Sequence, residues 1–174
     1  MTRLLRTIDL TEGELSVIRR LMDDAFHDFD DDDWQHTIGG WHVLVHDGVE
    51  LVAHAAVVER VLEIDDQPFR TGYVEGVATA PGRQGEGFGS AAMAEATELI
   101  RRTYELGALG TGAFHFYERL GWERWQGRTF VRDGDRRTHS VDDDGAVMVL
   151  RFGPSAEVDL AASISCDGRP GDDW

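Results

Sequence analysis

The sequence predicts an α/β fold in which helices flank a mixed, mostly antiparallel central sheet. Three observations lead to this prediction. Two β-rich runs in the first half are joined by a tight-turn signal. A glycine-rich loop then stands between an apolar run and an amphipathic one, and strand and helix patterns alternate after it. Antiparallel strands followed by strand–helix–strand units are typical of mixed sheets.

The N-terminal part is expected to hold one strand and two helices. Residues 3–8 have a strand pattern. Thr11 and Glu14 have the spacing of a capping box, and apolar residues recur at helical spacing from there to about Phe26. The acidic run 28–33 breaks this pattern. Because aspartates favour a helix N-terminus, a second short helix is expected to follow, carrying Trp34, His36 and Ile38.

The middle of the chain reads as a hairpin, a further strand and a long helix. His46-Asp47-Gly48 is a strong hairpin signal between the β-rich runs 41–45 and 51–62. The remaining elements expected here are a turn at 64–68, a strand at 69–79 and a helix from Phe88 to about Tyr104.

The last third is less regular. The elements expected are a strand at 106–111, a helix at 113–120 ended by Gly121 as its C′ residue, a strand starting at 122–125 and a last clear strand at 146–152. Residues 127–144 are interpreted as polar and irregular, and residues 153–174 as poorly patterned. Neither a repeat nor a low-complexity linker divides the chain, so residues 1–174 are predicted to form a single domain.

Composition narrows the classes of partner. The chain has 174 residues, 41% hydrophobic and 29% charged, which is typical of one soluble domain with a real core. Its formal net charge of -16 disfavours nucleic acid and anionic membrane surfaces as partners. The same charge would attract a cationic small molecule, although plain solubility is an equally simple explanation.

The cytoplasm is the expected compartment. No apolar run approaches membrane-spanning length, and residues 1–6 lack the apolar segment of a signal peptide. Cys166 is the only cysteine, so neither an intrachain disulfide nor a cysteine-rich metal cluster is expected. The acidic run does not match a calcium loop, because Asp33 and Gly39 stand where that loop needs glycine and glutamate. The histidine spacings match no zinc motif, so no metal is predicted.

Residues 84–89, Gln-Gly-Glu-Gly-Phe-Gly, are the most informative stretch. A glycine-rich loop that opens a helix can direct several backbone N–H groups at one anion, and the helix dipole adds positive potential. The spacing Gln-x-x-Gly-x-Gly matches neither the Walker loop nor the dinucleotide fingerprint. A turn in which the glycines merely supply positive φ is the alternative.

This motif resembles the pyrophosphate loop of the GNAT superfamily of acetyl-CoA-dependent N-acetyltransferases, and residues 116–122 resemble that family's late Tyr-x-x-x-Gly-Trp motif. More narrowly, the chain resembles the aminoglycoside 2'-N-acetyltransferases. The segments that carry this resemblance are 33–40, 53–58, 72–77, 104–109, 142–145 and 172–174.

The resemblance implies a GNAT fold, splayed at the acetyl-CoA site, in a homodimer. It implies acetyl transfer from acetyl-CoA to the 2'-amine of an aminoglycoside, by direct attack in a ternary complex. Two other readings stay open: a GNAT enzyme that acts on another polyamine or amino sugar, and a non-catalytic protein that binds acyl-CoA or sequesters drugs.

Amine acetylation needs a group that removes a proton from the amine and one that protonates the leaving thiolate. Glu75, in the apolar run before the glycine loop, is the candidate base, with a solvent-facing strand charge as the alternative. Tyr117 is the candidate acid because its neutral hydroxyl carries a proton at pH 7. By pattern alone Tyr117 fits a core aromatic residue, and the resemblance favours the catalytic role. No cysteine stands near the motifs, so no covalent acyl-enzyme is expected.

The remaining site residues follow mainly from the resemblance. Arg83 is included for its positive charge, with a solvated loop residue as the alternative. Those assigned to acetyl-CoA are Val77, Thr79, Arg83, Gln84, Gly85, Gly87, Phe88 and Gly89. Those assigned to the cationic substrate are Asp28, Trp34, Glu75, Gly76, Asp143, Asp172, Asp173 and Trp174 with its α-carboxylate. Solvent-exposed ion pairs contribute little each, so several carboxylates are needed. For residues 172–174 a frayed chain end is the alternative.

Overall fold

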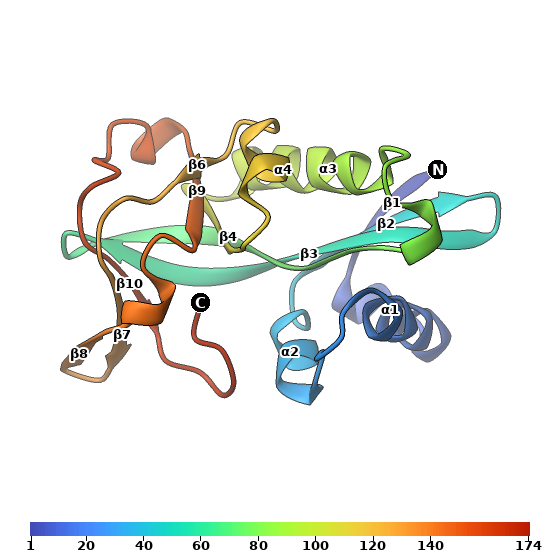
Figure 1. Ribbon diagram of the computed structural model, residues 1–174, viewed down its shortest axis with the longest axis horizontal. Coiled ribbons are helices and arrows are strands. Elements are labelled where there is room, and N and C mark those ends of the chain that lie inside the picture. The colour runs from blue at the N-terminus through green and yellow to red at the C-terminus, as the bar shows by residue number, and fades with distance from the viewer. The chain divides into compact units, whose positions relative to one another are not determined.

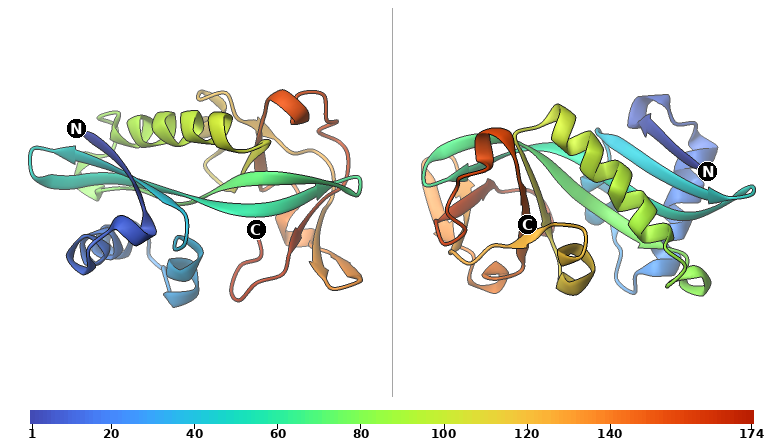
Figure 2. Two further views of the ribbon diagram at one scale, coloured as in Figure 1. Left: turned by 180° about the vertical axis from the view of Figure 1, so that it is seen from behind. Right: turned by 90° about the horizontal axis from the view of Figure 1, so that it is seen from above.

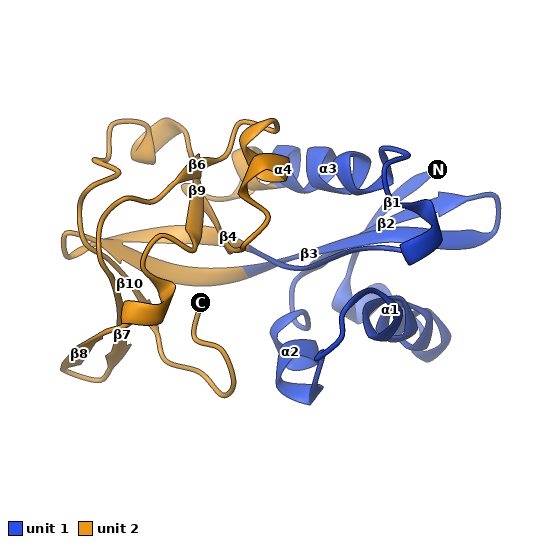
Figure 3. Cartoon of the chain, in the orientation of Figure 1, with its two compact units in different colours: residues 1–58, 74–99 blue, residues 59–73, 100–174 orange.

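The computed structural model describes all 174 residues, which divide into two compact units (Figure 3). Unit 1 comprises residues 1–58 and 74–99, and unit 2 comprises residues 59–73 and 100–174. Three elements contribute residues to both units: β3 (Glu50–Ile64), β4 (Gln67–Thr79) and α3 (Phe88–Thr103). The organisation of residues 1–174 as a single domain stays a prediction.

Unit 1 is built on antiparallel strands. β1 (Thr2–Arg6) pairs with β2 (Trp41–Asp47), and β2 pairs with β3 through the hairpin that the sequence predicts. Gly48 occupies the turn of this hairpin with φ +59°. The helices α1 (Glu12–Ala25) and α2 (Asp31–His36) lie on one face of these strands, and α3 lies on the other (Figures 1 and 2).

Both N-terminal helices begin at the caps that the sequence predicts. Thr11 Oγ1 accepts a hydrogen bond from Glu14 N at 3.2 Å, and Glu14 Oε2 accepts one from Thr11 N at 3.0 Å. Asp30 Oδ1 accepts from the amides of Asp32 and Asp33 at 2.8 and 3.0 Å. Such caps stabilise a helix by about 1 kcal/mol each. The second helix ends at His36, so Ile38 lies outside it.

The core of unit 1 forms where α1 covers the strands. Ile18, Leu21 and Met22 of α1 are buried together with residues of all three neighbouring strands, namely Leu44, Leu51 and Ala78. Each fully buried large apolar side chain contributes roughly 1.5–3 kcal/mol to folding. This packing holds the end of β4 that leads into the glycine loop.

Unit 2 contains the remaining strands. β5 (Leu106–Gly110) pairs in parallel with β4 over Thr71–Tyr73 and antiparallel with β9 (Val147–Arg151), which also pairs with β6 (Glu123–Arg124). β10 (Ile164–Asp167) pairs antiparallel with the end of β3 and parallel with β7 (Thr129–Asp133), and β7 pairs antiparallel with β8 (Arg136–His139). The short helix α4 (Phe114–Glu118) follows β5. The predicted mixed and mostly antiparallel pairing is thereby confirmed.

Two predictions about irregular segments were wrong. Residues 127–144 contain β7 and β8, and residues 153–174 contain β10. Arg132 of β7 is only 12% exposed and pairs with Glu63 at 3.3 Å and Asp167 at 2.9 Å. These strands are therefore held by ion pairs and backbone bonds between distant segments, which leave no hydrophobic period in the sequence.

One smaller difference lies at the N-terminus, where β1 ends at Arg6 and a 3-10 turn takes up Thr7–Asp9. None of the helices has the length and apolar character that a membrane-spanning segment requires.

Candidate active site

The glycine loop joins β4 to α3 in unit 1. Gly85 and Gly87 have φ of +82° and +90°, and a Cβ added to either would meet no atom within 4 Å. The first intrahelical bond of α3 runs from Ala91 N to Gly87 O at 3.0 Å, so the amides of Phe88, Gly89 and Ser90 have no acceptor one turn back. Open backbone at a helix N-terminus fits an anionic phosphate group.

Arg83 precedes this loop and is surrounded by carboxylates. Its guanidinium lies 2.7 Å from Asp47, 3.1 Å from Glu86 and 3.8 Å from Glu50, and 4.8 Å from the ring centroid of Phe88. Hydrogen bonds to Glu86 and Asp47 raise the pKa of Arg83 further above its usual value. Much of its positive charge is thus already compensated within the protein.

β4 carries Glu75, Gly76 and Val77 at half-buried positions. Gly76 has φ +53°, and a Cβ there would lie 2.9 Å from both Met22 Cε and Thr37 Cγ2. Both the left-handed backbone and the crowding therefore require glycine. The carbonyl oxygen of Gly76 lies 2.8 Å from His54 Nδ1.

Tyr117 lies in α4, buried against aromatic rings in unit 2. Phe116 and Trp122 contact it edge-on, with ring centroids 4.9 and 6.5 Å away. Gly121, with φ +87°, turns the chain so that Trp122 N donates to Tyr117 O at 3.2 Å. Burial raises the pKa of Tyr117 to about 12, opposed by a hydrogen bond with Thr111. The hydroxyl is therefore protonated at neutral pH, as a proton donor must be.

The C-terminal tail is held in place within unit 2. The Trp174 side chain is only 9% exposed, and a Cβ added to Gly110 would lie 3.3 Å from the terminal carboxyl carbon. Arg169 N donates to Asp173 Oδ1 at 2.9 Å, and Arg169 Nε donates to the Asp172 carbonyl at 2.7 Å. These contacts favour an ordered tail over the alternative of a frayed end.

The other acidic residues differ in their surroundings. Asp28 is exposed between α1 and α2. Asp143 is half-buried and accepts a hydrogen bond from Ser140 Oγ. Its neighbour Asp144 accepts from Thr129 N at 2.8 Å, and its other oxygen lies 2.8 Å from His139 Nε2. Asp144 therefore shapes the loop that presents Asp143.

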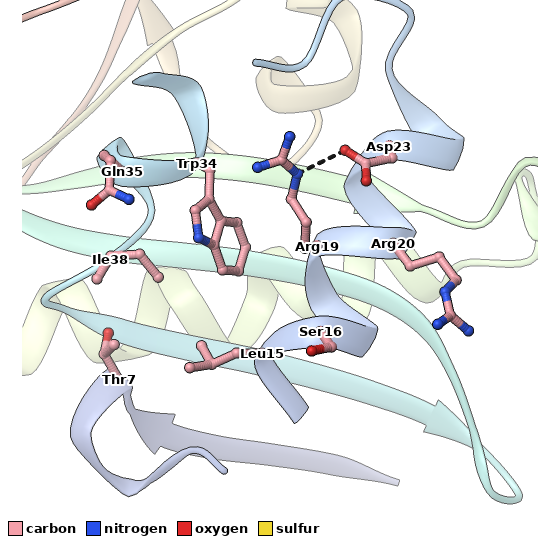
Figure 4. Close-up of a pocket in the computed structure, with 9 residues that line it drawn as sticks. All are labelled: Thr7, Leu15, Ser16, Arg19, Arg20, Asp23, Trp34, Gln35 and Ile38. Carbon is pink, nitrogen blue, oxygen red and sulfur yellow. Dashed lines mark hydrogen bonds and ion pairs between the residues drawn. The ribbon is translucent and has the colours of Figure 1, made fainter. Parts of the chain in front are cut away.

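Trp34 lines an open cavity of about 580 Å³ between α1 and α2 (Figure 4). The Arg19 guanidinium lies 5.9 Å from its ring centroid and bonds to Asp23 at 2.8 Å. A cation thus already stands beside this ring. The cavity is lined by Thr7, Leu15, Ser16, Arg19, Arg20, Asp23, Trp34, Gln35 and Ile38.

The expected site residues fall into both units. Those in unit 1 are Asp28, Trp34, Glu75, Gly76, Val77, Thr79 and residues 83–89, and those in unit 2 are Tyr117, Asp143 and residues 172–174. His54, whose Nδ1 lies 2.8 Å from Gly76 O, was not among the predicted site residues. Neither were Gly110 and Arg169, the residues that contact the tail.

A family model described as an acetyltransferase (GNAT) domain matches residues 6–125. The chain belongs to the GNAT family of acetyltransferases. It is 40% identical over 177 residues to an aminoglycoside 2'-N-acetyltransferase from Mycolicibacterium fortuitum, across 99% of this chain and 91% of the relative. The resemblance seen in the sequence motifs is confirmed.

Solved structures support the same fold. The GNAT family N-acetyltransferase YhbS from Escherichia coli, in complex with CoA, superposes with a TM-score of 0.67 at 13% identity over 95% of this chain and 88% of that one. The GCN5-related N-acetyltransferase from Kribbella flavida gives 0.61 at 25% identity over 74% of this chain. This match covers 34% of that protein, so the chain spans about a third of its length.

These findings confirm the predicted GNAT fold and the prediction that the chain is an acyltransferase. GNAT acetyltransferases use acetyl-CoA as the acyl donor, and the open glycine loop of this GNAT chain fits its phosphates.

Proposed function

We propose that this GNAT enzyme acetylates the 2'-amine of aminoglycoside antibiotics and thereby gives resistance to them. The observation that carries the proposal is the 40% identity over 99% of the chain with the M. fortuitum enzyme. The net charge of -16 supports a polycationic substrate, because the field of the protein raises the local concentration of cations.

The substrate ammonium groups are bound by Asp28, Asp143, the tail aspartates and the carboxylate of Trp174, with further contacts from Trp34 and Gly76. The two tail aspartates have different roles. Asp172 has an exposed side chain and can reach a ligand, whereas Asp173 spends Oδ1 on Arg169 N. Asp172 is therefore the proposed ligand, and Asp173 holds the tail.

Acetyl-CoA supplies the activated acyl group as a thioester. Backbone amides of residues 84–89 bind its phosphates, and the backbones of Val77 and Thr79 bind the pantetheine arm. Arg83 acts mainly by shaping the loop entrance, because its charge is shared with Asp47 and Glu86.

The amine attacks the acyl carbon directly, so one C–N bond forms, one C–S bond breaks and one proton moves from nitrogen to sulfur. Glu75 accepts the amine proton, directly or through one water molecule. The Tyr117 hydroxyl donates a proton to the sulfur. Cys166 is buried and takes no part as an acyl acceptor.

The test is thiol release from acetyl-CoA with a panel of amines. An aminoglycoside with a 2'-amine should be turned over, and a matched compound with a 2'-hydroxyl should bind without turnover. Turnover of other polyamines alone would favour the second reading, a GNAT enzyme of different substrate. Binding of both ligands without any thiol release would favour a sequestering protein. We also expect the enzyme to be cytoplasmic. We expect it to be a homodimer, which light scattering of the purified protein tests.

A further inference from the structure

Two buried histidines of unit 1 form a continuous hydrogen-bond chain that ends at the candidate site. Thr7 Oγ1 lies 2.9 Å from His42 Nε2, His42 Nδ1 lies 2.9 Å from His54 Nε2, and His54 Nδ1 lies 2.8 Å from Gly76 O. Both rings have no exposed surface. We call Thr7, His42, His54 and Gly76 O the histidine chain.

The direction of every hydrogen bond in the histidine chain follows from its last member. A carbonyl oxygen only accepts, so His54 Nδ1 carries a hydrogen. Burial lowers the pKa of His42 to about 4 and that of His54 to about 3, so both rings are neutral at pH 7 and each has one N–H. His54 Nε2 therefore accepts from His42 Nδ1–H, and His42 Nε2 accepts from the Thr7 hydroxyl.

Thr7 closes the chain at its outer end. Its hydroxyl oxygen also accepts from Gly39 N at 3.0 Å. The hydroxyl hydrogen has two acceptors in reach, His42 Nε2 at 2.9 Å and Gly40 O at 3.3 Å, and the shorter contact is the one to His42. Because the other end is a carbonyl, the histidine chain cannot pass a proton to the active site. Its effect is to fix the orientation of the group that it binds.

That group is the Gly76–Val77 peptide, which follows Glu75 directly. The C=O and N–H of a trans peptide point in opposite directions within one plane. His54 of β3 contacts Gly76 O through its ring Nδ1, so Val77 N–H points away from the His54 ring. A hydrogen bond accepted at the oxygen also polarises the peptide and strengthens its N–H as a donor.

A packing role alone explains this arrangement poorly. Replacing buried hydrogen-bonded partners by apolar groups of the same shape is often nearly neutral for stability. Here two fully buried rings instead support one carbonyl, at a β4 residue whose φ of +53° removes it from ordinary strand geometry.

We propose that His54, supported by His42 and Thr7, is a positioning residue that orients and polarises the Gly76–Val77 peptide, so that Val77 N–H binds the acyl donor. The inference rests on the proposed function, in which the Val77 backbone binds the pantetheine arm of acetyl-CoA. It does not depend on which amine accepts the acetyl group.

The first test uses the ligand-free protein. In ¹⁵N-histidine spectra, His42 and His54 should both be neutral Nδ1–H tautomers at pH 7. An Nε2–H tautomer at His54 would overturn the proposal, because Gly76 O would then have no donor. In backbone spectra, His54→Leu should move the Val77 amide proton toward a weaker donor. His46→Gln, on β2 outside the histidine chain, is the matched control and should leave that resonance unchanged.

The second test is acetyl-CoA affinity by calorimetry. His54→Leu should weaken binding by about 2- to 10-fold, the worth of one neutral hydrogen bond. His54→Asn, whose side-chain amide can replace the Nδ1–H donor, should recover part of the loss. If His54→Leu does not fold, Thr7→Val removes the outer donor, together with the acceptor of Gly39 N, and should move the Val77 amide in the same direction by less. Wild-type Val77 resonance and affinity in folded His54→Leu would refute the positioning role.

These readouts separate the two proposals. Failure of the aminoglycoside proposal would appear as absent turnover in the wild-type enzyme, with the histidine tautomers and the Val77 shifts as described. Failure of the inference would appear as unchanged Val77 shifts in an enzyme that still acetylates aminoglycosides.

Discussion

Replacing Gly87 by alanine separates the backbone geometry of the glycine loop from its ligand binding. With φ +90°, Gly87 is in the left-handed region, where an L-residue costs about 1–2 kcal/mol. No steric cost is added, since a Cβ meets no atom within 4 Å. For a chain of this size, each kcal/mol lowers the melting temperature by about 2–4 °C. The folded protein should therefore survive with a melting temperature roughly 2–8 °C lower.

The effect on acetyl-CoA should be much larger. The added methyl group fills the open space through which a phosphate would reach the loop amides. Loss of one hydrogen bond to a charged group costs about 1.5–3 kcal/mol, which corresponds to a 10- to 150-fold weaker dissociation constant. Calorimetric titration with CoA measures this directly. Gly87→Val should increase the loss.

Gly134→Ala is the matched control. Gly134 has φ +58° in the turn between β7 and β8, and a Cβ there also meets nothing within 4 Å. It carries the same kind of backbone strain outside the glycine loop, so CoA affinity should stay at the wild-type value. If Gly87→Ala and Gly134→Ala bind CoA equally well, the loop does not hold the phosphates and the reasoning fails.

Three further predictions concern chemistry, substrate and stability. Glu75→Gln should flatten the acidic limb of the pH–rate profile, and each of Glu75→Gln and Tyr117→Phe should lower the rate on the order of 10²–10⁴-fold. Because the pKa of Tyr117 is about 12, Tyr117→Phe should lower the rate without reshaping the profile below that pH; near-wild-type rates in both folded variants would remove these roles. Deleting residues 172–174 should weaken aminoglycoside binding, with less salt dependence, and spare acetyl-CoA affinity in calorimetry. Because His42 and His54 have pKa values of about 4 and 3 in the folded protein, below the unfolded value near 6.5, the unfolded state binds more protons below pH 6.5. The histidines' contribution to the free energy of unfolding is complete above pH 6.5. It should fall by about 1.4 kcal/mol per histidine for each pH unit below 6.5, until the pH reaches the folded-state pKa of that histidine. Urea unfolding at several pH values, with and without His54→Leu, measures this loss.

Local sequence patterns predicted the elements that depend on local chemistry. The capping box of Thr11 and Glu14 and the glycine at the turn of the β2–β3 hairpin act within a few residues, so they can be seen without knowledge of the fold. β7 and β10 were missed for the opposite reason. Arg132 becomes a nearly buried strand residue only because Glu63 and Asp167 arrive from distant segments.

The candidate site likewise contains residues that local motifs point to and residues whose contacts depend on distant segments. The glycine loop and Tyr117 stand in contiguous motifs, so the resemblance to a family can single them out as candidates. His54 carries no such mark, since its contact with Gly76 O depends on how β3 lies beside β4. The partners of Arg83 are likewise contributed in part by the β2–β3 hairpin, through Asp47 and Glu50. Roles that depend on long-range neighbours were therefore outside the reach of pattern analysis.

The surroundings of Arg83 also bear on how an acidic protein can bind an anionic coenzyme. At a net charge of -16, the long-range field repels CoA and attracts a polycation. Arg83 offsets little of this repulsion, because its guanidinium is already paired with Asp47 and Glu86. In the proposed function, the phosphates are bound by backbone amides and the helix dipole, which act only at short range. Fixed dipoles can hold the anion locally without reducing the acidic field that draws in the cation. In a protein this acidic, glycines in residues 84–89 therefore allow anion binding by the backbone, whereas additional basic side chains would weaken the field that attracts the cation.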